Sequence, residues 1–105
     1  AKDEQVIRAL AEAGSNMSKP HSLEHHFVCP SREAAGPVVA WGKASGYQSS
    51  EVIDDEFEGR RYVYFDLVMS TVPTIAEVTM HTSAMLEIAA RHGVEYDGWG
   101  CEVVE

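Results

Sequence analysis

Three consecutive residues, Glu24, His25 and His26, have side chains that could bind a metal ion or transfer protons. Imidazole and carboxylate groups are common zinc ligands, and both can act as general bases. Apolar and polar residues alternate around them, which predicts a strand over 20–29. Neighbouring side chains of a strand point to opposite faces, so His25 would point away from the other two. We therefore predict no metal site here and interpret His25 as a buried imidazole with a hydrogen-bond partner.

A second group of candidate residues lies in the acidic segment 51–58, which has the five carboxylates of Glu51, Asp54, Asp55, Glu56 and Glu58. The segment lacks the spacing of a calcium-binding EF-hand loop. Like charges this close together are tolerated in water or beside cations. We predict that residues 54–59 form the turn of a hairpin. This turn is either a solvated loop that protects a sheet edge, or a docking face on which Asp54, Asp55 and Glu56 contact a basic partner.

The third candidate is the segment Tyr96-Asp97-Gly98-Trp99-Gly100. Two glycines beside an indole weaken a strand and usually mark a bulge or a close approach of another backbone. No helix follows the glycines, so a phosphate-binding loop is not predicted. One interpretation makes Trp99 a core residue that packs on a helix. The other makes the segment a strand edge, with Tyr96 and Asp97 exposed, where Tyr96, Asp97 and Trp99 contact a partner protein.

No combination of residues in the chain matches a catalytic motif. The sequence lacks a nucleophile elbow with its Ser, His and Asp, a Cys–His signature, a P-loop and a pair of carboxylates placed for glycoside hydrolysis. The two cysteines, Cys29 and Cys101, are far apart and form no CxxC motif, so we interpret them as reduced thiols. We predict a protein that is not an enzyme and needs no cofactor.

Seven elements are predicted to position these residues. Apolar residues at helical spacing predict helices over 3–13, 31–43 and 74–92, and β-rich runs predict strands over 20–29, 47–53, 61–69 and 96–104. The helix over 74–92 has the strongest end signals, because Thr74 and Glu77 form a capping box and Gly93 can end the helix. The residues expected to face the core are Val63, Phe65, Leu67 and Met69 on the third strand, Ile75, Val78, Thr82, Met85, Leu86 and Ala89 on the last helix, and Trp99, Cys101 and Val103 on the last strand.

The order of these elements predicts an α+β fold. A helix is followed by strand, helix, two strands, helix and strand, which is typical of a ferredoxin-like sandwich (βαββαβ) with an added N-terminal helix. Right-handed crossovers would place four antiparallel strands in the order 4-1-3-2, with two helices on one face. We predict one domain over residues 1–105.

The composition limits the classes of partner. Eight Lys and Arg residues against 17 Asp and Glu give a net charge of −9, which repels nucleic-acid phosphates and attracts basic protein surfaces. No apolar run approaches the roughly 20 residues of a membrane-spanning helix, and the first residues lack the features of a signal peptide. We therefore expect a cytoplasmic protein that binds neither nucleic acid nor a membrane.

The sequence also resembles a known family over most of its length. The strand with Leu23-Glu24-His25-His26, the Gly46-Tyr47 pair, the helix over 74–92 and the segment Val94-Glu95-Tyr96-Asp97-Gly98-Trp99-Gly100 occur in the order and at the spacing of the regulator of ribonuclease E activity, type B, a family of RNase E inhibitors. The resemblance implies a ferredoxin-like fold and a non-catalytic role, in which the protein binds the basic C-terminal scaffold region of RNase E and lowers RNA cleavage. Opposite charges would favour binding to such a disordered, arginine-rich scaffold.

Two other classes of function stay open from the residues alone. A small-ligand or metal-binding regulatory domain would need a pocket, or a third ligand beside Glu24 and His26. An enzyme that uses His25 or His26 as a base would need a histidine with a strongly shifted pKa in a cleft. The two free edge strands of the predicted sheet would also permit a weak homodimer.

Overall fold

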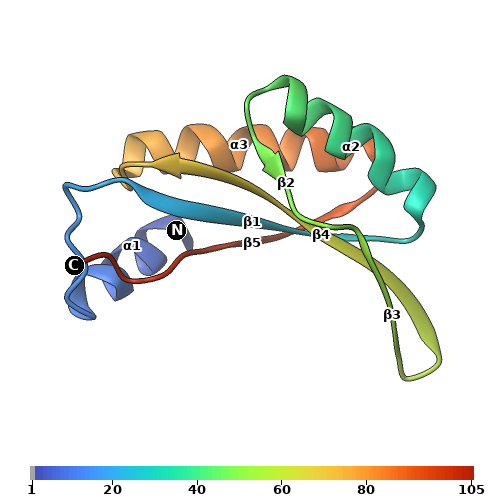
Figure 1. Ribbon diagram of the computed structural model, residues 1–105, viewed down its shortest axis with the longest axis horizontal. Helices are drawn as coiled ribbons and strands as arrows, with labels where there is room; N and C mark the ends of the chain where they lie inside the picture. Colours follow the sequence, from blue (N-terminus) through green and yellow to red (C-terminus); the bar gives the residue numbers. More distant parts are fainter. Residues whose placement is uncertain (1) are drawn as a thin grey trace.

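The computed structural model describes residues 2–105 and has three helices and five strands (Figure 1). The α+β prediction is confirmed, whereas the sheet has five strands in place of the predicted four. The elements in chain order are α1 (Lys2–Glu12), β1 (His21–Cys29), α2 (Arg32–Ala44), β2 (Gln48–Ser49), β3 (Ile53–Phe57), β4 (Arg60–Thr71), α3 (Ile75–His92) and β5 (Glu95–Gly100).

All strand pairs of the sheet are antiparallel. The strands lie in the order β2-β4-β1-β5, and β3 also pairs with β4. The long central strands β1 and β4 pair from His21 with Thr71 to Cys29 with Val63. Helices α2 and α3 pack against each other on one side of the sheet, and the hairpin of β3 and β4 extends beyond them (Figure 1). The sheet therefore has β5 at one edge and β2 with β3 at the other.

The acidic segment is a strand, which corrects the prediction of a turn over 54–59. Residues 48–49 pair with β4, the chain then leaves the ladder, and β3 pairs with β4 from Ile53 to Phe57. Only Glu58 and Gly59 form the turn, with φ values of 52° and 77°. Positive φ at both positions gives the type I′ turn, which matches the twist of the flanking strands. The acidic side chains are tolerated in the strand because every residue of β3 is exposed to solvent.

The last strand is shorter than predicted, because β5 ends at Gly100 and not near residue 104. After Gly100 the chain leaves β1 and joins the loop that follows α1. The amide of Asn16 donates to the carbonyl of Val104 at 2.6 Å, and the amide of Val104 donates to Ser15 Oγ at 2.9 Å. Val103, which was expected to share the inner face with Trp99, is consequently exposed.

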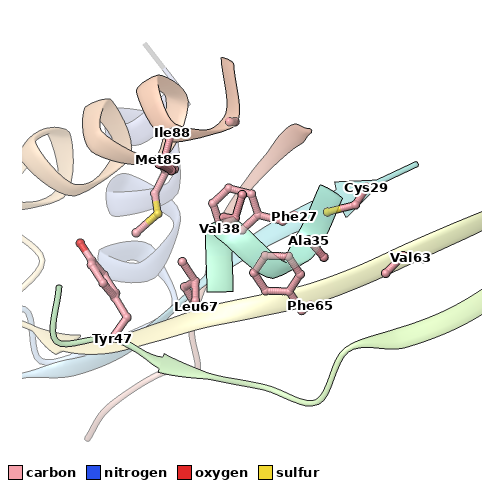
Figure 2. Packing of buried hydrophobic residues seen from close by; sticks show 11 residues of the cluster. Phe27, Cys29, Ala35, Val38, Tyr47, Val63, Phe65, Leu67, Met85 and Ile88 are labelled. Atoms are coloured by element: carbon pink, nitrogen blue, oxygen red, sulfur yellow. The ribbon is translucent and has the colours of Figure 1, made fainter. Parts of the chain in front are cut away.

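The main core lies between the sheet and helices α2 and α3 (Figure 2). The rings of Phe27 and Phe65 stack at its centre, with centroids 5.2 Å apart. The predicted inner face of β4 is confirmed, because Val63, Phe65 and Leu67 are buried and Met69 packs against them. Helix α2 approaches β4 closely because Gly42 has no side chain: a Cβ atom there would lie 2.6 Å from Leu67.

Helix α3 begins and ends where the sequence predicted. The Thr74 side chain accepts a hydrogen bond from the amide of Glu77, and Gly93 ends the helix with a φ of 65°. The buried residues are Val78, Thr82, Met85, Ile88 and Ala89. The predictions for Ile75 and Leu86 were wrong, because their exposed fractions are 45% and 58%. Leu86 follows Met85 by about 100° around the helix axis, which turns it out of the buried stripe.

Candidate functional site

A bulge in β5 turns both of its aromatic side chains toward the helices. Trp99 pairs with His25 and Tyr96 pairs with Phe27, so β5 has two residues, Asp97 and Gly98, opposite one residue of β1. Gly98 adopts a φ of 90°, which a residue with a side chain rarely does. The predicted bulge is confirmed. The interpretation in which Tyr96 is exposed is not supported, because the extra residue brings Tyr96 and Trp99 to the same face and leaves Tyr96 half-buried.

Tyr96 is bonded to the histidine that the sequence predicted to be buried. Its hydroxyl forms a hydrogen bond of 2.9 Å with Nδ1 of His25, whose exposed fraction is 1%. Burial, with repulsion from His81, lowers the pKa of His25 to about 4. Burial also raises the pKa of Tyr96, as does the negative charge of Asp3. Both groups are therefore uncharged at neutral pH, and the interpretation of His25 as a bonded core imidazole is confirmed.

A second pair of rings lies next to the first. The hydroxyl of Tyr47 is hydrogen-bonded to Nδ1 of His81 on α3, and the Tyr47 ring meets the His25 ring edge to face at a centroid distance of 6.0 Å. Burial raises the pKa of Tyr47. This contact could not be predicted from the sequence, because its two residues are 34 positions apart and no local pattern links them. Each of these four polar rings thus forms one hydrogen bond within the group, and among residues 2–105 no serine, threonine or cysteine is bonded to either histidine.

Asp3 joins the N-terminal helix to this part of the molecule. Its carboxylate accepts a hydrogen bond of 3.1 Å from Trp99 Nε1 and one of 2.7 Å from Thr82 Oγ1. It therefore connects α1, α3 and β5 through one side chain. In its local sequence Asp3 is only an acidic residue in the first turn of α1. Its partners are 79 and 96 positions away, and no local pattern could have identified them.

A groove of about 650 Å³ opens between α1, α3 and β5. All three contact candidates of the last strand line it, so the structure brings Tyr96, Asp97 and Trp99 together. Asp97 is exposed, while Tyr96 and Trp99 form part of the inner wall. Trp99 has an exposed fraction of only 8%, which agrees with its interpretation as a core residue. The other lining residues are Lys2, Asp3, Gln5, Val6, Thr82, Leu86, Glu95 and Gly98.

The acidic candidates Asp54, Asp55 and Glu56 lie at the opposite edge of the sheet, on β3. Arg32 Nε donates to Asp54 Oδ2 at 2.5 Å, and the Tyr64 hydroxyl donates to Asp55 Oδ2 at 2.5 Å. These hydrogen bonds leave Glu56 as the member of the group whose side chain has no bonded partner among residues 2–105. The two sets of predicted contact residues therefore belong to separate surfaces.

Two arginines lie across the ladder from the acidic strand. Arg61 pairs with Glu56, and Arg60 pairs with Phe57. The β3 surface thus has a mixed charge pattern, although its sequence segment is strongly acidic. The hydrogen bond from Tyr64, with a second from the amide of Glu56, lowers the pKa of Asp55 and keeps this carboxylate ionised.

A metal site at Glu24 and His26 would need a third ligand, and the structure places none beside them among residues 2–105. His26 Nδ1 lies 2.8 Å from Asp66 Oδ1 on β4, with both side chains partly exposed. Among residues 2–105, no group of three His, Cys, Asp or Glu side chains is arranged to hold a metal ion. Glu24 and His26 lie on the sheet face opposite His25, as alternation along β1 requires.

Both cysteines are free thiols, as interpreted from the sequence. Burial raises the pKa of Cys29 to about 11, and burial with the nearby Glu24 raises that of Cys101. Neither sulfur is therefore an activated nucleophile at neutral pH.

Comparison with known proteins gives a consistent result. A family model described as regulator of ribonuclease activity B matches residues 1–101. A regulator of ribonuclease activity B from Colwellia psychrerythraea is 31% identical over 98 residues, which cover 92% of this chain and 84% of that protein. A protein with the same description from Pseudoalteromonas atlantica is 26% identical, over 98% of this chain and 89% of that protein. One from Alteromonas mediterranea is 29% identical, over 95% of this chain and 76% of that protein.

Within residues 2–105, no helix has both the length and the apolar character needed to cross a membrane.

Proposed function

Since this chain belongs to the regulator of ribonuclease activity B family, we propose that it is a non-catalytic regulator of the endoribonuclease RNase E. In this proposal the protein binds the basic C-terminal scaffold region of the enzyme and lowers its cleavage of RNA. Residues 1–105 act as one regulatory domain. A regulator of RNA cleavage must share the compartment of its target, so the proposal includes a cytoplasmic location.

The net charge of −9 is the observation that best supports this partner. A negative field attracts an arginine-rich segment over several ångströms and raises the rate of encounter, while it repels the phosphates of RNA. Regulation would therefore proceed through the protein partner and without direct contact with the RNA substrate. A disordered scaffold segment can follow a small folded surface and loses its conformational entropy only on binding.

Two surfaces are proposed to contact the scaffold. One is the β5 edge, with Asp97 exposed and Tyr96 and Trp99 in the groove wall. The other is β3, with Asp54, Asp55 and Glu56 exposed. The surfaces lie at opposite edges of one sheet, so one extended segment that binds both would have to cross the molecule. Simultaneous binding at two linked sites raises the overall affinity beyond that of either site.

The interior histidines do not favour catalysis. His25 has a strongly lowered pKa, but its ring is buried and is not among the residues that line the groove. One observation favours the small-ligand alternative, which is the size of the groove. Its volume of about 650 Å³ is within the range of about 300–1,000 Å³ that is typical of ligand pockets. We assign the groove to a protein partner because its exposed rim is acidic.

The proposal is tested by RNA cleavage with two forms of RNase E, the full-length enzyme and a form that lacks the C-terminal scaffold region. Adding this protein should slow cleavage by the full-length enzyme and leave the shortened enzyme unaffected. Equal inhibition of both forms would place the contact on the catalytic part and contradict scaffold binding. No inhibition of either form, with the protein folded, would reject the proposed function.

A further inference from the structure

We propose that the groove between α1, α3 and β5 is an arginine-binding site, which holds the guanidinium group of an extended basic segment of a partner protein. The inference rests on the proposed function and deepens it, because it assigns the specific contact to one of the two acidic surfaces. It further predicts that this contact distinguishes arginine from lysine.

The wall of the groove is apolar and aromatic. Tyr96 and Trp99 contribute rings, and Val6 and Leu86 contribute aliphatic surface from α1 and α3. Leu86 is 58% exposed in the middle of α3, next to the buried Met85. A guanidinium group is planar and weakly hydrated, so it stacks on aromatic rings and tolerates an apolar wall better than an ammonium group does.

The polar part of the groove is negative. The groove is lined by three carboxylates and one basic residue, which are Asp3, Glu95, Asp97 and Lys2. Neither Glu95 nor Asp97 takes part in an ion pair within residues 2–105. On β3, in contrast, Asp54 already forms an ion pair with Arg32. The groove therefore has carboxylates available for an incoming cation.

Asp3 is fixed in position before any partner arrives. The hydrogen bonds from Trp99 and Thr82 use one lone pair on each of its oxygens. A carboxylate can accept about four hydrogen bonds, so Asp3 retains acceptor sites. Such preorganisation lowers the entropy that binding would otherwise cost.

The bulge in β5 favours side-chain recognition over the addition of a further strand. A partner strand needs a regular row of backbone donors and acceptors, and a bulge at Asp97 and Gly98 interrupts that row. The same bulge presents the Asp97 carboxylate at the rim while Tyr96 and Trp99 line the wall. An extended segment would thus be held by its side chains.

Nuclear magnetic resonance can test the site, because the chain has only two tryptophans. The indole N–H signal of Trp99 reports on the groove, and that of Trp41 on α2 is an internal control. The probes are the RNase E scaffold region and two synthetic peptides of equal length, identical except that every arginine of one is lysine in the other. The Trp41→Phe variant assigns the two signals.

The proposal predicts that the scaffold region and the arginine peptide shift the Trp99 signal and leave the Trp41 signal in place. The arginine peptide should bind at least fivefold more tightly than the lysine peptide. Asp97→Arg should weaken binding at least tenfold. Glu12→Arg, at the other end of α1 and exposed, makes the same change in net charge and should weaken binding less than threefold.

The outcomes separate this inference from the proposed function. If the scaffold region binds but the Trp99 signal stays in place, or arginine and lysine peptides bind equally, the groove assignment is overturned while scaffold binding stands. If the scaffold region does not bind a folded protein, the proposed function fails and the inference fails with it. A Trp99 shift caused by free arginine or another small cation, without peptide or scaffold binding, would reassign the groove to a small ligand and also overturn the proposal.

Discussion

Asp3 connects three elements through one carboxylate, so its loss should affect the fold as well as the groove. In Asp3→Ala the indole N–H of Trp99 loses its acceptor in a part-buried environment, and the hydroxyl of Thr82 keeps only its bond of 3.3 Å to the carbonyl of Thr79. Leaving buried polar groups unsatisfied costs about 1–3 kcal/mol, and we expect the free energy of unfolding to fall by about that amount. Urea unfolding measures the change. Glu4→Ala, at an exposed position of the same turn, is the control and should cost less than about 0.5 kcal/mol; equal losses would show that Asp3 acts only through helix charge.

His25 should make stability depend on pH in a mildly acidic range. Its pKa is about 4 in the folded protein against 6.5 ordinarily. Between these values the unfolded chain binds a proton that the folded protein does not, so the free energy of unfolding falls as pH decreases from about 6.5 to about 4. Below pH 4 this group causes no further loss. The full effect is of the order of 3 kcal/mol.

The measurement is the slope of unfolding free energy against pH between 7 and 5, where carboxylates contribute little. His25→Gln should flatten the slope even if it also lowers stability. His92→Gln, which replaces a partly exposed histidine at the end of α3, is the matched control, and His25→Gln should have the flatter slope of the two. A slope that is the same with and without His25 would contradict this account.

At the scale of elements, the bulge in β5 depends on one glycine. Gly98→Ala has room for a methyl group but places a side chain at a φ of 90°, which should cost about 1–2 kcal/mol. Gly100→Ala is the matched control, because Gly100 lies in the same strand, its φ is not positive, and a methyl group added there would make only an ordinary contact, 3.7 Å from His26 Nε2. There the same change should stabilise the protein by about 0.5–1 kcal/mol. Thermal unfolding of both variants decides the point, and two changes of the same sign would contradict it.

The sequence predicted those elements whose signals are local. Thr74, Glu77 and Gly93 define α3 by their own backbone chemistry, and the alternation through Leu67 defines the inner face of β4. The two glycines beside Trp99 also predicted the bulge, which is a local property of the backbone. These features depend on neighbours within a few residues, so they can be read from one segment at a time.

The errors arose where a distant part of the chain decides the outcome. The acidic run was predicted to be a turn because so many charged residues are not typical of a strand. They form a strand in the folded molecule because the extended hairpin exposes β3 to water. Tyr96 is an exception, because the interpretation with an exposed Tyr96 left out the effect of the bulge, which is local, on the direction of its ring. The groove itself depends on Asp3 and Thr82, which meet Trp99 only in the folded molecule.

At the scale of the whole molecule, the distribution of charge should decide how the protein associates. Self-pairing through β3 in a two-fold arrangement would place Asp54, Asp55 and Glu56 against their own copies, and like charges opposite each other destabilise a strand pair. We therefore expect any homodimer to be weak and to strengthen as salt screens the repulsion. Sedimentation at two salt concentrations measures this, and a tight dimer at low salt would contradict it.

Electrostatic attraction is proposed to hold the protein on the scaffold region of RNase E, and one titration measures this directly. The protein is titrated with the scaffold region at low and at physiological salt, beside a variant in which Asp54, Asp55 and Glu56 are replaced by lysine. We predict saturable binding that weakens as salt increases and is reduced by the triple replacement. Absence of binding at both salt concentrations, with the protein folded, would contradict the central claim.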